Sequence, residues 1–323
     1  MDSNNLKKIL HINTITKHAT SQPKLDQLNT TINNNISPNY KLKKYLGTGI
    51  NNSKIYLATD RNDTQLVCQI TTLPKKHKGQ LMLELSILDI LSKNRNTAPY
   101  INKYIDYNLT QTDNNIIAYT MFPLNTGYKL NNLKGELVKL NKETRKYISK
   151  AIIKSILQAI SAIHKRNIAH QNLDDTSIIV SHTPSFEEKT KTHNLKVKVK
   201  LVDFALSCGV YKSNNNMKFE KCLMMTNDDK VELEANTKSM LKSLSNTEQL
   251  NIAQMNDVKD CGVIFSNLLN VEDGKVDKDI KPYYDVINNF MTVELDKRLS
   301  AKDCLEKILT NEKYGNKNEK KRK

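Results

Sequence analysis

The most regular stretch of the chain lies between residues 141 and 166 and predicts one long amphipathic helix. Apolar residues recur there at helical spacing, at Ile148, Ile152, Ile156, Ile160 and Ile163. This spacing places them on one face of an α-helix, and that face must be buried against other elements. A polar segment and the apolar triplet 178–180 follow, so the helix is expected to lead through a loop into a buried strand.

The segment that leaves this helix, IHKRNIAHQNLDDTSIIV at residues 163–180, resembles the catalytic loop of the eukaryotic protein kinases. In that family the loop reads His-Arg-Asp-Leu, followed by a Lys, an Asn and a short strand. His170, Leu173 and the strand agree with the pattern. The other positions differ. Gln171 replaces the Arg and Asn172 replaces the catalytic Asp. Asp174 replaces the Lys, and Ser177 replaces the metal-binding Asn.

A glycine-containing turn near residue 47 resembles the family's phosphate-binding loop. Residues 40–73 alternate, turn at Gly47-Thr48-Gly49 and alternate again, which predicts a strand, a loop and further strands. Gly47 and Gly49 match two of the family's three glycines, whose role is to let backbone N–H groups approach phosphates. The third glycine is absent, and Asn52 or Ser53 occupies that region.

Two positions match the family's lysine and glutamate pair. Gln69 lies in a predicted strand where the resemblance implies the lysine that grips the nucleotide phosphates. A neutral amide cannot supply that charge. Glu84 lies in residues 79–91, which have helical periodicity, and matches the glutamate partner. It is expected either to hydrogen-bond Gln69 or to face water as an ordinary residue of a helix surface.

Three later segments continue the resemblance in the family's order. Asp203-Phe204-Ala205 resembles the Asp-Phe-Gly motif, which makes Asp203 a candidate magnesium ligand. Residues 257–269 resemble the helix whose Asp holds the catalytic-loop backbone, and residues 285–309 resemble the family's last helical pattern. Residues 206–255 take the place of the activation segment and lack its Ala-Pro-Glu ending.

The resemblance implies an α+β class with a bilobal protein-kinase-like fold, in which a small antiparallel sheet with one helix precedes a larger, mainly helical lobe. Residues 39–124 would form the small lobe and residues 125–312 the large lobe. Strands are expected at 101–106 and 115–122 within the small lobe. Residues 1–38 are expected to form a disordered leader, and residues 313–323 a disordered basic tail.

The composition limits the possible partners and the cellular location of the protein. The chain has 50 Lys and Arg against 34 Asp and Glu, a formal charge of +16, which fits either a solvated lysine-rich surface or an attraction to nucleic acid through that surface and the tail. The five cysteines form no close pair and are expected to be reduced thiols. No run approaches about 18 apolar residues, so no membrane span is expected. An intracellular protein, cytoplasmic or nuclear, is the simplest interpretation.

Phosphoryl transfer needs a lysine on the phosphates, metal ligands and a base. Only Asp203 remains of these, so the resemblance implies a pseudokinase that scaffolds or regulates a protein partner, such as an active kinase or its substrate. No catalytic residue and no cofactor are expected, although Gly47, Gly49, Glu84 and Asp203 could retain weak binding of ATP and magnesium. Two alternatives stay open, a divergent active Ser/Thr protein kinase and a basic nucleic-acid-associated protein on a kinase-like platform.

Overall fold

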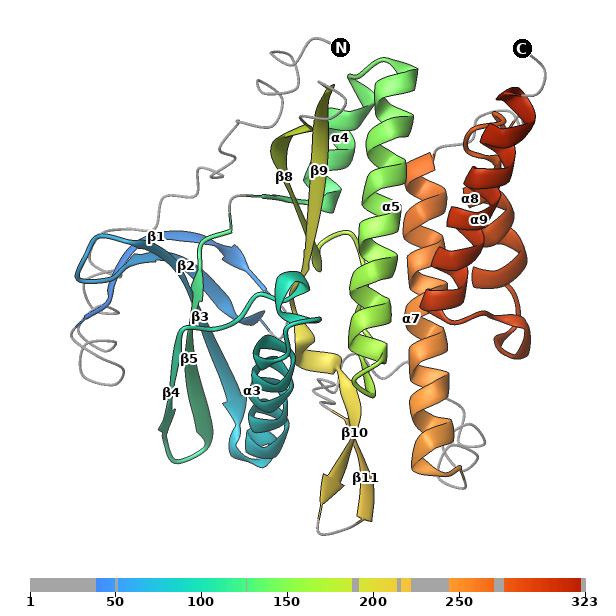
Figure 1. The fold of residues 1–323 in the computed structure, drawn as a ribbon. Coiled ribbons are helices and arrows are strands. Elements are labelled where there is room, and N and C mark those ends of the chain that lie inside the picture. The colour runs from blue at the N-terminus through green and yellow to red at the C-terminus, as the bar shows by residue number, and fades with distance from the viewer. Residues whose placement is uncertain are drawn as a thin grey trace.

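A computed structural model describes residues 39–49, 52–125, 127–187, 192–213, 216–221, 244–269 and 276–320. The predicted leader, residues 1–38, lies outside the described residues, as do residues 222–243 of the segment expected to replace the activation segment. Within the described part the chain is mixed α+β, as predicted. A β-sheet with one helix occupies one side of the molecule, and most of the helices stand side by side on the other (Figure 1).

The first half of the described chain forms a five-stranded antiparallel sheet in the order β1-β2-β3-β5-β4. Its strands are β1 (Lys41–Thr48), β2 (Lys54–Thr59), β3 (Gln65–Pro74), β4 (Asp106–Gln111) and β5 (Asn115–Pro123). Alternate apolar side chains make one face of the sheet a small core that includes Leu42, Tyr56, Cys68 and Met121. Helix α3 (Lys78–Lys93) follows β3, which confirms the helix predicted at 79–91.

The strand expected at 101–106 is wrong over most of its length, because β4 begins only at Asp106. Ile101 is buried and forms an isolated parallel bridge with Leu201, far along the chain. Ile105, in contrast, is 52% exposed. The apolar residues of this stretch therefore do not share one sheet face, although their spacing in the sequence suggests that they do.

The described helices of the second half include the predicted amphipathic helix. They are α4 (Leu130–Val138), α5 (Lys142–His164), α7 (Asn246–Leu269), α8 (Lys281–Val286) and α9 (Ala301–Lys320). Helix α5 packs against α7 and α9. Helix α5 confirms the prediction at 141–166, and all five of its predicted core isoleucines are buried. It begins at Asn141, whose side-chain oxygen accepts the backbone N–H of Thr144 at 2.9 Å and thus caps the first turn.

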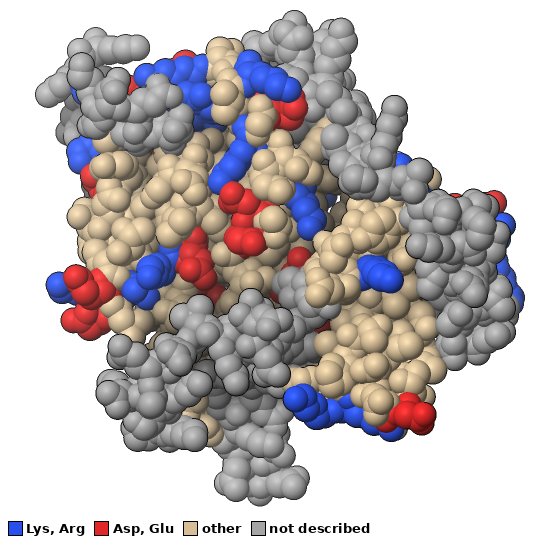
Figure 2. All heavy atoms as spheres, turned by 180° about the vertical axis from the view of Figure 1, so that it is seen from behind, with Lys and Arg blue, Asp and Glu red and all other residues tan. Residues whose placement is uncertain are grey.

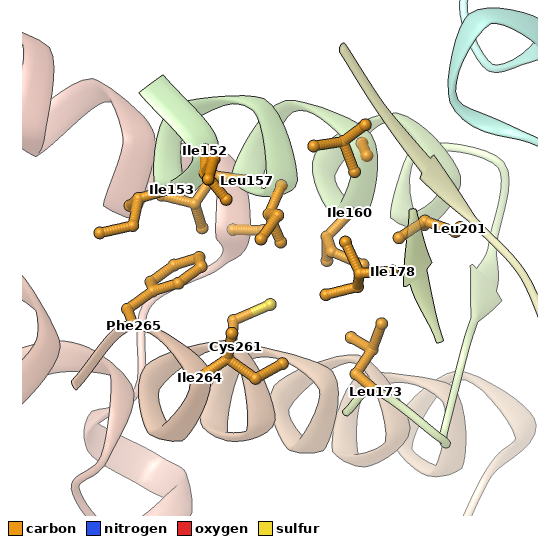
Figure 3. Close-up of a cluster of buried hydrophobic side chains, with 14 of the residues drawn as sticks. Ile152, Ile153, Leu157, Ile160, Leu173, Ile178, Leu201, Cys261, Ile264 and Phe265 are labelled. Atoms are coloured by element: carbon orange, nitrogen blue, oxygen red, sulfur yellow. The ribbon is translucent and has the colours of Figure 1, made fainter. Parts of the chain in front are cut away.

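The main hydrophobic core lies between α5 and α7 and extends to the strands beside them (Figure 3). Gly262 of α7 packs closely against residues 291 and 292. A Cβ atom there would lie 2.8 Å from Thr292 Cγ2 and 3.1 Å from the Cβ of Met291. Met291 ends a π-helical turn, Ile287–Met291, that continues α8. Glycine at 262 therefore allows this turn to pack directly on the helix.

Two small sheets join the helices to the loops that carry the candidate residues. One has the order β6-β8-β9 and the other β11-β10-β7. Their strands are β6 (Tyr128–Lys129), β7 (Ile168–Ala169), β8 (Ile178–Glu187), β9 (Thr192–Leu201), β10 (Cys208–Ser213) and β11 (Asn216–Lys221). The strand predicted at 178–180 is the start of β8. Because Ile178 pairs with Leu201, the loop before β8 and residue 203 after β9 both lie at the open end of the β8–β9 hairpin.

Two boundaries in the second half differ from the predicted ones. Helix α7 begins at Asn246, so residues 246–255 are helical and not part of an irregular segment. The reason is a capping box, in which Ser245 N donates to Glu248 Oε2 at 2.7 Å and Glu248 N donates to Ser245 Oγ at 3.3 Å. Helix α9 continues to Lys320, so the disordered tail predicted from 313 is wrong for residues 313–320.

Candidate functional site

The candidate residues come from five separate elements. Gly47 lies near the end of β1 and Gly49 directly after it, Gln69 lies in β3 and Glu84 in α3. The loop between β7 and β8 supplies Asn172, Asp174 and Ser177, and Asp203 follows β9. Helix α3 contacts the short turn that begins at Phe204, so the sheet side and the helical side of the molecule meet at the residues after Asp203.

A backbone hydrogen bond joins the described residues on either side of positions 50 and 51 in the β1–β2 connection. Gly47 has a φ of +146°, a backbone conformation that side chains rarely permit. Asn52 takes a left-handed φ of 54°, so an asparagine adopts here a conformation for which glycine is the usual choice. Gly49 N donates to Ser53 O at 2.8 Å, and Ser53 is fully buried.

Gln69 makes its hydrogen bond to this connection. Its side-chain amide donates to Ser53 Oγ at 3.3 Å. Ser53 directly precedes β2, in which Ile55 pairs with Gln69. Among the described residues no hydrogen bond or ion pair joins Gln69 to Glu84, so the first of the two expectations for Glu84 is wrong. Neither the sequence nor its periodicity singled out Ser53 as the partner of Gln69.

Glu84 is partly exposed yet surrounded closely enough by protein to behave as a buried acid. Loss of solvation raises its pKa to about 7, and the negative charge of Asp203 adds to this. Burial also raises the pKa of Asp203, while the positive charge of Lys129 acts in the opposite direction. The two carboxyl groups therefore interact unfavourably, and the strand position that could hold a balancing lysine carries Gln69.

The loop before β8 is held by a buried carboxylate of α7, as the resemblance implied. Asp257 is fully buried. Its Oδ2 accepts the backbone N–H of His170 and its Oδ1 that of Gln171, both at 2.7 Å. His164 Nε2, at the end of α5, lies 2.9 Å from the same Oδ2. One side chain thus fixes α5, α7 and the loop to one another.

Two aromatic rings connect this loop to the turn after β9. The ring of His170 packs against that of Phe204 with 4.6 Å between centroids and 61° between planes. His170 Nε2 lies 2.9 Å from Val202 O, and burial lowers the pKa of the imidazole. The ring is therefore neutral at pH 7 and donates its Nε2–H to that carbonyl.

Gln171 uses its side chain within the fold. It has a left-handed φ of 61°, and its side-chain amide donates to Ala253 O of α7 at 2.6 Å. Ala253 belongs to the part of α7 that was not predicted as helix. The loop is thus tied to α7 through the Asp257 carboxylate and, one turn earlier, through the carbonyl of Ala253.

Asp174 and Ser177 form a closed turn. Asp174 Oδ1 accepts hydrogen bonds from Thr176 N at 2.7 Å and Ser177 N at 2.8 Å. Ser177 is fully buried, and its hydroxyl lies 3.0 Å from both the N and the O of Asp174. Both side chains therefore make hydrogen bonds to the backbone of their own turn. Because the buried Ser177 hydroxyl is held by the backbone of Asp174, the side chains here do not fit a magnesium ion shared between Ser177 and Asp203.

The surface on the far side of the molecule from the view of Figure 1 carries acidic side chains near its middle, with basic side chains around them (Figure 2). The formal charge of +16 therefore does not make this face uniformly basic. In the described part of the chain, no three His, Cys, Asp or Glu side chains gather as a metal site would require. No described helix is long and apolar enough to cross a membrane.

Comparison of the chain with protein-family models and with curated protein sequences returned no match. The assignment of a function therefore depends on the residues and contacts described above.

Proposed function

We propose that this protein is a pseudokinase, a member of the protein kinase superfamily with a bilobal kinase-like fold that has kept the frame of the catalytic site and lost its chemistry. The observation that carries the proposal is the buried Asp257 carboxylate, which holds the backbone N–H groups of His170 and Gln171. This is the role that the resemblance assigns to the α7 aspartate. A motif that recurs by chance would have no reason to reproduce a contact between residues 86 and 87 positions apart.

The order of elements supports the same proposal. A five-stranded antiparallel sheet with α3 precedes the helices, and the loop and Asp203 lie together at the open end of one hairpin, β8–β9, where Ile178 pairs with Leu201. The contact between His170 and Phe204 joins two motifs that the resemblance places together in an intact kinase site. The boundary between the lobes would fall near residue 124, directly after β5.

The side chains argue against phosphoryl transfer. Asn172 is an amide and cannot accept the hydroxyl proton as a carboxylate base would. Asp174 puts a negative charge where the family places a lysine, and Ser177 is engaged with the backbone of its own turn. At about 5 Å a carboxylate repels a phosphate charge by roughly 3 kcal/mol for an effective dielectric of 20. Nucleotide binding is accordingly weak, and magnesium strengthens it little.

A protein without transfer chemistry can act through the surfaces of its fold. We assign it a scaffolding or regulatory role toward a protein partner, an active kinase or the substrate of one, inside the cell. Four buried cysteines, Cys68, Cys208, Cys261 and Cys304, are free thiols, in keeping with a reducing compartment.

A radiolabelled transfer assay tests the proposal. The unmodified chain is incubated with labelled ATP, magnesium and generic protein substrates, beside the Asp203→Ala variant as the matched control. We expect equal, background incorporation in both. Transfer by the unmodified chain that Asp203→Ala abolishes would replace the pseudokinase with a divergent Ser/Thr kinase. Salt-sensitive binding to DNA or RNA, without any effect of nucleotide, would favour a nucleic-acid-associated protein instead.

A further inference from the structure

The three-stranded sheet β6-β8-β9 has one buried face and one outer face. Directly paired residues of neighbouring strands lie on the same face of a sheet. Ile178 pairs with Leu201 and Val180 with Val199, and all four are buried in the main core. Figure 3 shows Ile178 and Leu201 among the core side chains. Because successive side chains of a strand alternate, the residues between these pairs lie on the outer face.

The outer face gathers lysines from two strands. Lys129 of β6 pairs with Ile179 of β8, and Ile179 pairs with Lys200 of β9. In the next row Ser181 pairs with Lys198. Lys198 and Lys200 are thus about 7 Å apart along one strand, and Lys129 lies about 10 Å away across two strands. Lys129, Lys198 and Lys200 are called the lysine face below.

No ion pair joins the two β9 lysines to a carboxylate among the residues that the structure describes. Lys198 is exposed and Lys200 is half-buried. Burial lowers the pKa of Lys200, and the positive charge of Lys198 adds to this effect. In contrast, Lys134 of the adjoining helix α4 forms an ion pair with Asp175. The β9 lysines therefore form a local excess of positive charge.

Lys129 lies between this excess of charge and the candidate site. Its positive charge acts on Asp203, where it opposes the rise in pKa that burial causes. The charge of Lys129 is therefore partly balanced, and Lys198 and Lys200 carry the part that is not.

We propose that the lysine face binds an acidic segment of a protein partner, which lies extended over β9 and carries Asp or Glu at every second position. An extended chain repeats the side chains of one face at about 7 Å, which equals the spacing of Lys198 and Lys200 along β9. A carboxylate over each ammonium group relieves the repulsion between them. Lys129 contacts the flank of the same segment.

The neutral residues of the outer face favour a peptide over a nucleic acid. Single-stranded nucleic acids bind through aromatic side chains on which their bases stack, in addition to positive charges. The neutral residues here are Ile179 and Ser181, and neither offers a ring. Binding at this face involves no nucleotide and no phosphoryl transfer, so it can fail or succeed independently of the proposed function.

Fluorescence anisotropy with a labelled peptide of repeated Glu-Thr pairs, at low salt, tests the location of binding. The double variant Lys198→Gln, Lys200→Gln is expected to bind about tenfold more weakly than the unmodified chain. The double variant Lys297→Gln, Lys302→Gln is the matched control, because it removes the same charge from side chains that are 65% and 62% exposed. It should stay within about twofold. An equal loss in both would show that the overall charge attracts the peptide, and would overturn the proposal.

The extended geometry has its own test. A peptide of the same composition with its glutamates in one block should bind about threefold more weakly, because only every second glutamate can face the sheet. Equal affinity for the two peptides would overturn the extended geometry. Tighter binding of a single-stranded DNA of equal charge, lost in the β9 double variant, would assign the face to nucleic acid and overturn the peptide.

Acetylation of the lysines, followed by mass spectrometry, locates the contact without any variant. At a peptide concentration of about four times Kd, modification of Lys198 and Lys200 should slow about fivefold, as the occupancy of one site implies. Modification of Lys297 should not change. Equal protection of Lys297, or no protection of the β9 lysines, would overturn the proposal.

Discussion

One carboxylate oxygen of Asp257 accepts the backbone N–H of His170 at 2.7 Å, and the other oxygen accepts that of Gln171 at the same distance. Because an ionised carboxylate with two N–H donors is stabilised in a buried site, this contact is worth more than a neutral hydrogen bond. An amide in its place would direct an NH2 group at one of the two donors.

Asp257→Asn is therefore expected to lower the free energy of unfolding by about 3 kcal/mol, measured by urea denaturation at pH 7. Asp260→Asn is the matched control one turn later on α7. Burial raises the pKa of Asp260 to about 6, so its charge is unfavourable and its removal should be neutral or stabilising. Equal destabilisation by both variants would contradict the role of Asp257.

The raised pKa of Glu84 gives the protein a pH-dependent stability. In the folded state the pKa of this carboxyl is about 7, against 4.5 for a solvated glutamate. Between these values the folded protein binds more protons than the unfolded chain, so the contribution of Glu84 is present below about pH 4.5 and is lost as the pH rises through 7.

Glu84→Gln should thus stabilise the protein at pH 8 by on the order of 2 kcal/mol and have little effect at pH 4.5. Denaturation at the two pH values gives the comparison. Glu306→Gln, at an exposed position of α9, should change the stability by less than about 0.5 kcal/mol at both. A pH-independent effect of Glu84→Gln would show that ionisation of this group is not responsible.

Lys146 of α5 is expected to stabilise the start of α8. Its side chain is only 11% exposed and lies 2.6 Å from Asp277 and 3.0 Å from Glu143. These partners raise the pKa of its ammonium group. Lys146→Met should lower the stability by about 1 kcal/mol, whereas Lys142→Met, at a 64% exposed side chain bonded to the same Asp277, should stay within about 0.5 kcal/mol. Urea denaturation of the two variants in parallel decides between them.

The capping box at the start of α7 should also be measurable. Ser245→Ala removes a hydroxyl that accepts from Glu248 N, and a loss of about 1 kcal/mol is typical of an N-cap. The same substitution at the exposed Ser266, in the last turn of α7, should have a smaller effect. Hydrogen exchange of the first turns of the helix, residues 246–250, would localise the change.

The sequence predicted those elements whose apolar spacing is uninterrupted. Helix α5 was predictable because its isoleucines recur over more than four turns. The start of β4 was not predictable from the alternation of apolar residues. Ile101 forms a bridge with the distant residue Leu201, so it fits the alternating pattern of a strand only by coincidence. The N-terminal half of α7 was missed although Ser245 and Glu248 carry a recognisable capping signal.

In the candidate site, the positions of Asp203, Asp257 and the loop could be predicted from motifs. The hydrogen bonds made by the side chains that replace the family's residues could not. Gln171 bonds Ala253, and Gln69 bonds Ser53. Each of these contacts joins residues that are distant in sequence, and each depends on geometry that no local pattern reports. A substitution in a motif therefore indicates which chemistry is absent and not which contact has replaced it.

The close approach at Gly262 limits the order in which this protein can change during evolution. Any side chain at 262 would collide with Thr292 and Met291, so a replacement there becomes tolerable only after these two have shifted or become smaller. Shrinking them first opens a gap beside α7, which is destabilising but survivable, whereas enlarging residue 262 first is not. Descendants of this sequence should accordingly acquire changes at 291 or 292 before any change at 262, and an ancestor with alanine at 262 would be expected to carry a smaller residue opposite.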